Sequence, residues 1–367
     1  MLTHRFIRIL ALAALTLLLS PARLRADDFL QTNLVSSVPG LAATTDSNLI
    51  NPWGVSFSAT SPFWISDQGS GTAILTDGAG NLNSTVVSVP GSMTPPSGPT
   101  GQVNNGTTGF LVNGTPAKFI FDTLNGTIAG WNGGTTATTE VTTAGAVYTG
   151  LTLAASGGSN YLYAADSTGQ IRVFNSSYAP VSLSGNFTDP NAIAGYVPFN
   201  IQLIGSQLYV TYAQLGPGGA ALPGGYVDVF NTDGTFAERL ATGGALEAPW
   251  GITLAPAGFG SFGGDLLIGN FGNGEINAYS TSGTFEGILD GTNGLPLVND
   301  NLWALDFRTA GTNDNPDALY FTAGIDNQQQ GLFGEVTEVT PEPPSIILAG
   351  CGALAVVMMG RRARARA

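Results

Sequence analysis

The segment Ala248–Leu254 reads APWGITL and nearly repeats Asn51–Phe57, which reads NPWGVSF. Alignment on the small residue that follows the aromatic extends the repeat to six positions. These are Gly54, Gly101, Gly150, Asn200, Gly251 and Ala304, with intervals of 47 to 53 residues. A period of about 50 residues is typical of proteins in which each copy forms one supersecondary unit. We therefore expect six copies of one unit.

Each copy continues in the same order. A second apolar run follows the repeated phrase, such as FWISD from Phe63, and a third run follows a glycine turn. These runs alternate apolar and polar residues and are rich in β-branched and aromatic side chains, which indicates antiparallel strands. We find no convincing amphipathic helix in the body. A fourth strand follows in five copies, but the sixth copy ends at Thr340 without one.

The segment Phe29–Gly40 is a spare strand before the first copy, and it can supply the missing outer strand of the last. Closure of this kind leaves only short, protected sheet edges. The predicted fold is therefore all-β: a six-bladed β-propeller of four-stranded antiparallel blades, closed by the N-terminal strand. We expect residues 27–340 to form this domain.

The charge of the body is strongly acidic. Residues 27–340 hold 24 of the 25 Asp and Glu residues but only four of the 12 Lys and Arg residues. Such a surface repels phosphates and anionic lipid headgroups, so we expect no nucleic-acid partner. Cations and neutral ligands fit it better.

Both ends of the chain carry features of processing signals. Residues 1–26 combine basic residues with an apolar run and small residues, which predicts a secretory signal peptide cleaved after Ala22 or Ala26. The one cysteine, Cys351, lies outside the body, so no disulfide within the body is possible. At the other end, an apolar stretch of about 16 residues is short for a membrane span.

The segment 341–367 resembles the PEP-CTERM sorting signal of Gram-negative bacteria. The resemblance rests on Pro341, Glu342 and Pro343, the apolar stretch, and a basic end formed by Arg361, Arg362, Arg364 and Arg366. It implies an exosortase partner, transient anchoring in the inner membrane with the arginines on the cytoplasmic side, and final release to the outer envelope or the extracellular space. The alternative is a plain C-terminal membrane anchor.

The order PWG(I/V), (Y/W)(I/V)(A/S)D and GxIxx(F/Y) is similar to NHL-type six-bladed propellers. With the tail, the chain resembles an uncharacterised bacterial family of PEP-CTERM-associated propellers, from about Asp28 to the end. This resemblance implies a fold and a location, but it implies no activity, since function does not follow from fold.

Polar and aromatic side chains of the innermost strand are the candidate ligand-binding residues, because ligands of propellers bind where these strands converge. They are Asn51, Trp53, Thr100, Phe199, Asn200, Trp250, Asp300, Asn301 and Trp303, with Tyr148 and Asn299 beside them. Two interpretations stay open. The tryptophans pack between blades, or they line a funnel for a neutral ligand such as a sugar, whose C–H faces stack on aromatic rings.

A metal site is a second possibility, because hard cations such as Ca²⁺ take several oxygen ligands. Asn51, Asn200, Asp300 and Asn301 come from different blades and are the candidate ligands for Ca²⁺, without any contiguous calcium-binding loop. Asp67, Asp122, Asp166 and Asn270 recur at the end of the second strand, and we expect them to support turns instead.

Enzyme classes that need histidine are excluded for the body, since His4 is the only histidine. No catalytic residue is identified. The favoured function is an exported envelope or extracellular-matrix propeller that binds a neutral glycan or a protein. The alternatives are a calcium-dependent lactonase or esterase and a purely structural surface component.

Overall fold

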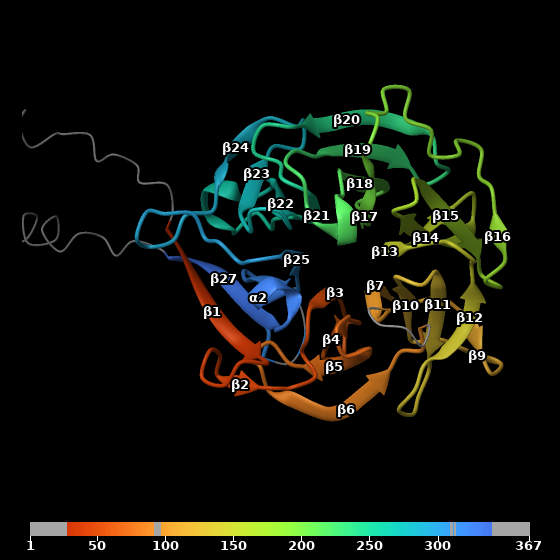
Figure 1. Cartoon of the computed structure of the whole chain (residues 1–367), viewed down its shortest axis with the longest axis horizontal. Helices are drawn as coiled ribbons and strands as arrows, with labels where there is room; N and C mark the ends of the chain where they lie inside the picture. The colour runs from red at the N-terminus through yellow and green to blue at the C-terminus, as the bar shows by residue number, and fades with distance from the viewer. Residues whose placement is uncertain (1–27, 92–96, 309–310, 312, 340–367) are drawn as a thin grey trace, which may run out of the picture. The chain divides into compact units, whose positions relative to one another are not determined.

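Six β-sheets form a ring around a central axis in the computed structural model, which describes residues 28–91, 97–308, 311 and 313–339 (Figure 1). The ring is one compact unit, Phe29–Glu338. Each sheet has four main strands, and the sixth carries the short β2 as well. The predicted six-bladed all-β propeller is confirmed. The predicted signal segment 1–26 and tail 341–367 lie outside the described residues.

The first three blades follow one another along the chain. Blade one comprises β3 (Pro52–Ser56), β4 (Phe63–Asp67), β5 (Thr72–Thr76) and β6 (Leu82–Ser88). Blade two comprises β7 (Pro99–Asn104), β10 (Phe119–Thr123), β11 (Thr127–Trp131) and β12 (Thr138–Thr142). Blade three comprises β13 (Tyr148–Ser156), β14 (Ser159–Asp166), β15 (Gln170–Asn175) and β16 (Pro180–Val181).

The last three blades complete the ring. Blade four comprises β17 (Val197–Ile204), β18 (Gln207–Ala213), β19 (Tyr226–Asn231) and β20 (Phe236–Thr242). Blade five comprises β21 (Pro249–Leu254), β22 (Leu266–Asn270), β23 (Ile276–Tyr279) and β24 (Phe285–Ile288). Blade six comprises β25 (Leu302–Phe307), β26 (Leu319–Ala323), β27 (Leu332–Val339) and β1 (Asp28–Ser36), with β2 (Thr44–Thr45) beside β1.

The repeated phrase forms the innermost strand of every blade. These six strands, β3, β7, β13, β17, β21 and β25, contact one another in a closed circle. The contact is close enough to explain the small residue of the repeat. A Cβ atom added at Gly101 would lie 2.2 Å from the backbone nitrogen of Leu151, and one at Gly54 would lie 2.6 Å from the carbonyl oxygen of Thr100. Neighbouring backbones therefore exclude a side chain at Gly54 and Gly101, whereas the equivalent positions in blades four and six carry Asn200 and Ala304.

The middle strands are buried on both faces because each is sandwiched between two neighbouring blades. In β4, Phe63 and Ile65 pack toward blade six, with Tyr320 and Phe333. The intervening Trp64 packs toward blade two and stacks on Phe119 at 4.3 Å between ring centroids. Alternation along one strand thus fills two interfaces, and burial of this apolar area supplies the main driving force for folding.

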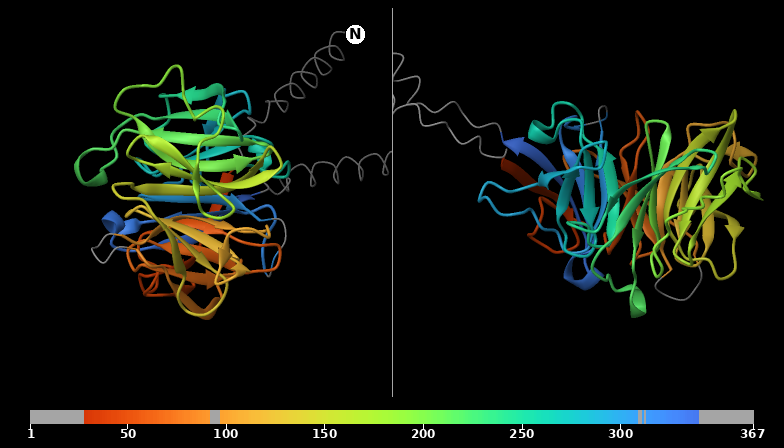
Figure 2. Two further views of the ribbon diagram at one scale, coloured as in Figure 1. Left: turned by 90° about the vertical axis from the view of Figure 1, so that its right-hand side faces the viewer. Right: turned by 90° about the horizontal axis from the view of Figure 1, so that it is seen from above.

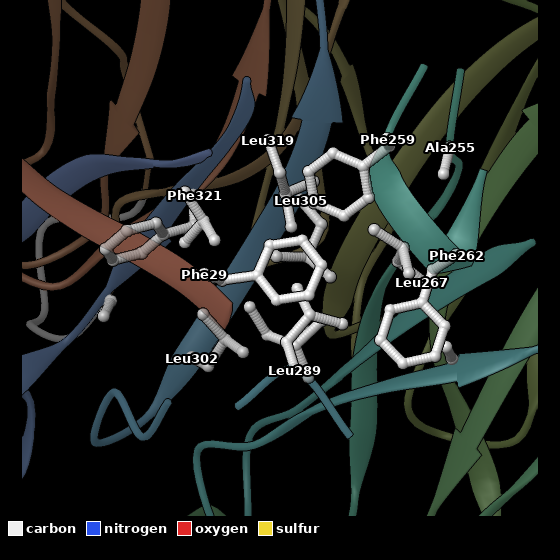
Figure 3. Close-up of a cluster of buried hydrophobic side chains, with 14 of the residues drawn as sticks. Phe29, Ala255, Phe259, Phe262, Leu267, Leu289, Leu302, Leu305, Leu319 and Phe321 are labelled. Atoms are coloured by element: carbon white, nitrogen blue, oxygen red, sulfur yellow. The ribbon is translucent and has the colours of Figure 1, made fainter. Parts of the chain in front are cut away.

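The N-terminal strand closes the ring as predicted, since β1 is the neighbour of β27 in blade six. The Phe29 ring enters the apolar cluster between blades five and six and stacks on Phe259 at 5.0 Å between centroids (Figure 3). The side-chain amides of Gln31 and Asn299 exchange hydrogen bonds of 3.0 and 2.9 Å. Asn299, a neighbour of the candidate ligand residues, therefore serves closure.

Other elements are short. Blade two carries a small hairpin, β8 (Leu111–Val112) with β9 (Thr115–Pro116), which the sequence did not predict. The helical segments among the described residues are η1 (Pro217–Gly219), η2 (Gly260–Phe262) and α2 (Ile325–Gln328). Figure 2 shows η1 and α2 projecting from the same side of the ring. Within the described ranges, no helix has the length and hydropathy required to cross a bilayer.

Candidate functional site

An axial cavity of about 690 Å³ opens at the N-terminal ends of the inner strands. All six blades contribute to it. Its wall is formed by Ile50, Asn51, Trp53, Gln68, Gly69, Leu124, Val147, Thr149, Ser167, Phe199, Leu215, Gly216, Gly218, Gly219, Phe271, Trp303, Asn327, Gln328 and Gln329. The glycine-rich excursion after β18 and the α2 turn supply the side of the wall that projects from the ring (Figure 2). We call this space the aromatic cavity.

Aromatic rings pack tightly in this cavity. The rings of Trp53 and Trp303 stack at 3.5 Å between centroids, and Phe271 stacks on the other side of Trp303 at 4.3 Å. Phe199 meets Phe271 edge to face at 5.8 Å. Trp53 and Trp303 occupy equivalent positions in two repeats, so the register of the repeat brings them together at the axis. The result is a rigid aromatic surface with little conformational entropy to lose on binding.

Asn51 organises the polar part of the wall. Its Nδ2 group donates to Gln68 Oε1 at 2.8 Å and to Gln328 Oε1 at 3.0 Å, while its Oδ1 atom accepts from Trp303 Nε1 at 2.9 Å. A φ of 46° places Asn51 in the left-handed region, where asparagine is tolerated better than most residues. This network joins blades one and six at the cavity.

Two buried donors in the wall have no acceptor among the described residues. They are the indole Nε1 group of Trp53 and the amide Nε2 group of Gln68. The Trp303 and Trp250 indoles, by contrast, donate to Asn51 Oδ1 and to the carbonyl oxygen of Thr149, each at 2.9 Å. A buried donor without an acceptor costs about 1–3 kcal/mol. A ligand or water oxygen that reached these two donors would remove this cost.

No Asp, Glu, Lys, Arg or His side chain is among the described residues that line the aromatic cavity. Its polar groups are amides and hydroxyls. Proton transfer by a positioned acid or base needs a titratable group, so this wall offers none for such a step. The arrangement favours binding of an uncharged molecule with apolar faces and oxygen acceptors.

The structure brings together four of the predicted ligand-binding residues: Asn51, Trp53, Phe199 and Trp303 all line the aromatic cavity. The five others lie elsewhere. Thr100 is buried and bonds Asp122 and Tyr148, whereas Asn200 and Trp250 line a separate hollow of about 30 Å³. Asp300 is exposed, and Asn301 is half-buried with its carbonyl accepting from the Gly324 nitrogen. Trp250 packs edge to face on Trp53 and Trp303, which also line the cavity, and a funnel for a neutral ligand stays a prediction.

The four predicted metal ligands do not share one cavity. Asn51 lines the aromatic cavity, Asn200 lines the small hollow, and Asp300 is exposed. No group of three or more His, Cys, Asp or Glu side chains gathers anywhere in the described part of the chain. Ca²⁺ binding by this set stays a prediction.

The aspartates at the ends of the second strands hold strands together. Asp122 Oδ1 accepts from the Thr100 hydroxyl at 2.7 Å and from the Gly101 nitrogen at 2.6 Å, and burial raises the pKa of Asp122 to about 7. Asp67 accepts from the Ile74 nitrogen, and its pKa is also raised by burial. Each carboxylate sits inside a blade, and none lines the aromatic cavity.

Sequence reasoning missed several wall residues. Gln68 and Phe271 follow the second strands of blades one and five, and the loops 215–219 and 327–329 follow the second strands of blades four and six. These positions lie outside the repeated inner strand, on which the candidate ligand-binding residues were predicted. The position just after the second strand recurs in the wall, as Gln68, Leu124, Ser167 and Phe271, and this shared position in the repeat is the signal that would have found them.

Two viral proteins resemble this chain over most of its length. "Uncharacterized protein R648" of Acanthamoeba polyphaga mimivirus is 34% identical over 326 residues, covering 83% of this chain and 78% of its own. "Uncharacterized protein L690" of the same virus is 31% identical over 333 residues, covering 83% and 84%. No family model matches the chain. These viral relatives overturn the resemblance to a bacterial PEP-CTERM-associated family, which rested on short tail and strand motifs.

Solved structures with a similar fold include several enzymes. A streptogramin B lyase matches with a TM-score of 0.50 and 14% identity, covering 85% of this chain and 97% of its own. The soluble aldose sugar dehydrogenase of Escherichia coli matches with a TM-score of 0.52 and 13% identity, covering 85% and 100%. The α-L-arabinanase of Penicillium chrysogenum matches with a TM-score of 0.53 and 12% identity, covering 84% and 97%. At these identities the likeness shows the fold alone.

Proposed function

The chain belongs to the family of these two mimivirus proteins, and from its own cavity we propose that it binds a neutral carbohydrate at the axis of the propeller. The observation that carries the proposal is the chemistry of the aromatic cavity. Stacked aromatic rings and buried amide and indole donors occur there without any titratable side chain among the described lining residues.

A carbohydrate ring matches each part of this wall. Its C–H faces are apolar and pack on aromatic surfaces, which Trp53, Phe199 and Phe271 contribute to the cavity wall. Its ring and hydroxyl oxygens accept hydrogen bonds, which Trp53 Nε1 and Gln68 Nε2 lack. A volume of about 690 Å³ lies within the usual range for small-molecule sites. A charged sugar would find no counter-ion in the described wall.

The proposal is tested by titrating the full chain with a panel of neutral oligosaccharides and following tryptophan fluorescence. We expect quenching or a spectral shift with at least one neutral glycan and none with polyuronates of the same length. The absence of binding across a broad neutral panel would overturn the proposal.

A matched pair of variants locates the site. Phe271→Leu keeps apolar volume but removes the ring that stacks on Trp303, and Phe285→Leu changes an exposed phenylalanine of the same blade. We expect F271L to weaken binding about tenfold, equivalent to about 1.4 kcal/mol, and F285L to leave it unchanged. Equal affinities for the two variants would place binding away from the aromatic cavity.

The proposal includes export of the propeller, supported by the composition of residues 1–26. Mass spectrometry of the mature protein checks it: a first residue after Ala22 or Ala26 supports export, whereas an intact Met1 contradicts it.

Calcium-dependent hydrolysis of lactones or esters stays the alternative, and no observation at the aromatic cavity favours it.

A further inference from the structure

A second cavity opens at the opposite, C-terminal ends of the inner strands. It has a volume of about 280 Å³ and adjoins the hollow of about 30 Å³ between the strands. The two share Val55, Gln102, Gln202 and Asp306 in their walls. No described residue of either wall belongs to the aromatic cavity. This region, which we call the polar mouth, is thus a separate site.

Oxygen-bearing side chains recur in the polar mouth because of the repeat. They stand two residues after the small residue in four blades: Ser56, Thr152, Gln202 and Asp306. Equivalent positions on neighbouring inner strands lie at one level around the axis, since these strands contact one another in a circle. Asp306 is the single carboxylate among the described residues that line the polar mouth.

Two buried oxygens of this wall have no hydrogen-bond partner in the described ranges: Gln102 Oε1 and Ser56 Oγ. Two hydrogen bonds fix the orientation of the Gln102 amide. Its Nε2 group donates to the carbonyl oxygens of Gly54 at 2.7 Å and Trp64 at 2.8 Å, so Oε1 is left facing away from both. Gln102 is 5% exposed and Ser56 is 8% exposed. An acceptor buried in this way favours a cation or a donor beside it.

Asp306 adds negative charge without a positive partner. The ion pairs among the described residues join Arg172, Arg239 and Arg308 to other aspartates, and Asp306 is in none of them. Within the described part of the chain, its side chain accepts one hydrogen bond, from the Phe307 nitrogen at 2.9 Å.

We propose that the polar mouth binds one divalent cation of the Ca²⁺ type, with Asp306 as the charged ligand and Gln102 Oε1 and Ser56 Oγ as neutral oxygen ligands. Hard cations take such oxygens, and water completes their coordination. The hollow of about 30 Å³ has the size of a single ion or water, and Gln102 and Asp306 line it, whereas Ser56 lines the adjoining second cavity. One carboxylate gives weak affinity, with a dissociation constant of about 10⁻⁴–10⁻³ M.

The test is thermal unfolding of the full chain with and without 10 mM CaCl₂, with NaCl of equal ionic strength as the reference. This Ca²⁺ concentration exceeds the upper end of the expected range of dissociation constants by about tenfold. We expect Ca²⁺ to raise the Tm by about 2–4 °C beyond the NaCl reference. Isothermal titration calorimetry with Ca²⁺ should give one site per chain. A Tm that responds equally to both salts overturns the proposal.

Two variants and one control assign the ligands. Asp306→Asn should abolish the specific Ca²⁺ response. Asp300→Asn makes the same charge change at an exposed carboxylate of the preceding loop and should leave the response intact. Ser56→Ala removes a hydroxyl with no partner among the described residues, so it should fold normally and bind Ca²⁺ several-fold more weakly. Wild-type binding by D306N or S56A overturns the assignment, and S56A decides the matter if D306N fails to fold.

Discussion

At the residue scale, equivalent positions of the repeat have different roles because their surroundings differ. Trp53, Trp250 and Trp303 stand at one register, and all three are buried. Trp303 and Trp250 have acceptors for their indole groups, whereas Trp53 has none among the described residues. The unsatisfied indole is therefore the member of the set that ligand binding would use.

A pair of substitutions isolates this difference. Trp53→Phe and Trp303→Phe remove the same atoms, but only W303F breaks a hydrogen bond, the one to Asn51 Oδ1. We expect W303F to be less stable than W53F by about 1 kcal/mol, measured by urea unfolding. Equal stabilities would show that the Trp53 indole has an acceptor, such as a buried water.

Asp122 makes stability depend on pH. Its pKa is raised from 3.8 to about 7 in the folded state, so between these values the folded chain holds a proton that the unfolded chain has lost. Stability from this group is thus present at low pH and falls as the pH rises toward 7, by about 1.4 kcal/mol per pH unit.

Asp122→Asn should remove this contribution, because an amide keeps the acceptor for Gly101 but does not titrate. We expect the free energy of unfolding of D122N to fall less steeply than that of the wild type between pH 4.5 and pH 6.5, a window of about two pH units. Parallel profiles from denaturant unfolding across this window would contradict the raised pKa.

At the element scale, the glycines of the repeat allow the inner strands to meet. Gly101 of β7 and Gly106 in the following loop form a matched pair. A Cβ at Gly101 would meet the Leu151 backbone at 2.2 Å, whereas one at Gly106 would have no atom within 4 Å. Alanine at Gly101 must push two blades apart, whereas alanine at Gly106 changes only the conformational freedom of the loop backbone.

We therefore expect Gly101→Ala to lower the free energy of unfolding by about 3 kcal/mol and Gly106→Ala to change it by less than about 0.5 kcal/mol. Thermal or urea unfolding of both variants measures this difference. A small effect of G101A would mean that the inner strands separate easily, which would remove the reason for a small residue in the repeat.

At the scale of the whole molecule, the two ends of the described chain meet in one blade, so the ring depends on β1. Phe29 is 1% exposed in the cluster between blades five and six, while its neighbour Leu30 is 50% exposed. At the start of β1 the closure therefore uses one face, whereas at its end Leu34 and Val35 are both buried in the cluster with blade one.

Phe29→Ala should destabilise the propeller by about 3–5 kcal/mol, because it removes a fully buried ring and leaves a cavity. Leu30→Ala should cost less than about 0.5 kcal/mol. Calorimetry of the full chain distinguishes them, and we expect one cooperative transition shifted to lower temperature for F29A. A minor shift for F29A would show that blades one to six hold together without this closure.

The two ends of the axis differ in chemistry. The N-terminal ends of the inner strands carry an aromatic, uncharged wall, and their C-terminal ends carry oxygen ligands around Asp306. A neutral carbohydrate and a cation therefore suit opposite ends of the same ring. The glycan titration and the Ca²⁺ experiments test the two proposals independently.

The amino-acid sequence by itself determined the number of blades and the closing strand. Both follow from the period of the repeat. The phrase recurs because each inner strand meets the backbones of its neighbours, and the segment Phe29–Gly40 fits the one copy in which a fourth strand was missing. The sequence also identified Asn51, Trp53, Phe199 and Trp303, because they belong to that phrase.

Only the tertiary structure decided the rest of both sites. Gln68, Phe271 and the loops 215–219 and 327–329 reach the aromatic cavity because curvature of the ring directs their connections toward the axis. Asp300, although close in sequence to Trp303, is exposed, whereas Asp306 lies at the polar mouth. Position along a strand sets the level of a side chain on the axis, but the closed ring determines which side chains from other blades it meets.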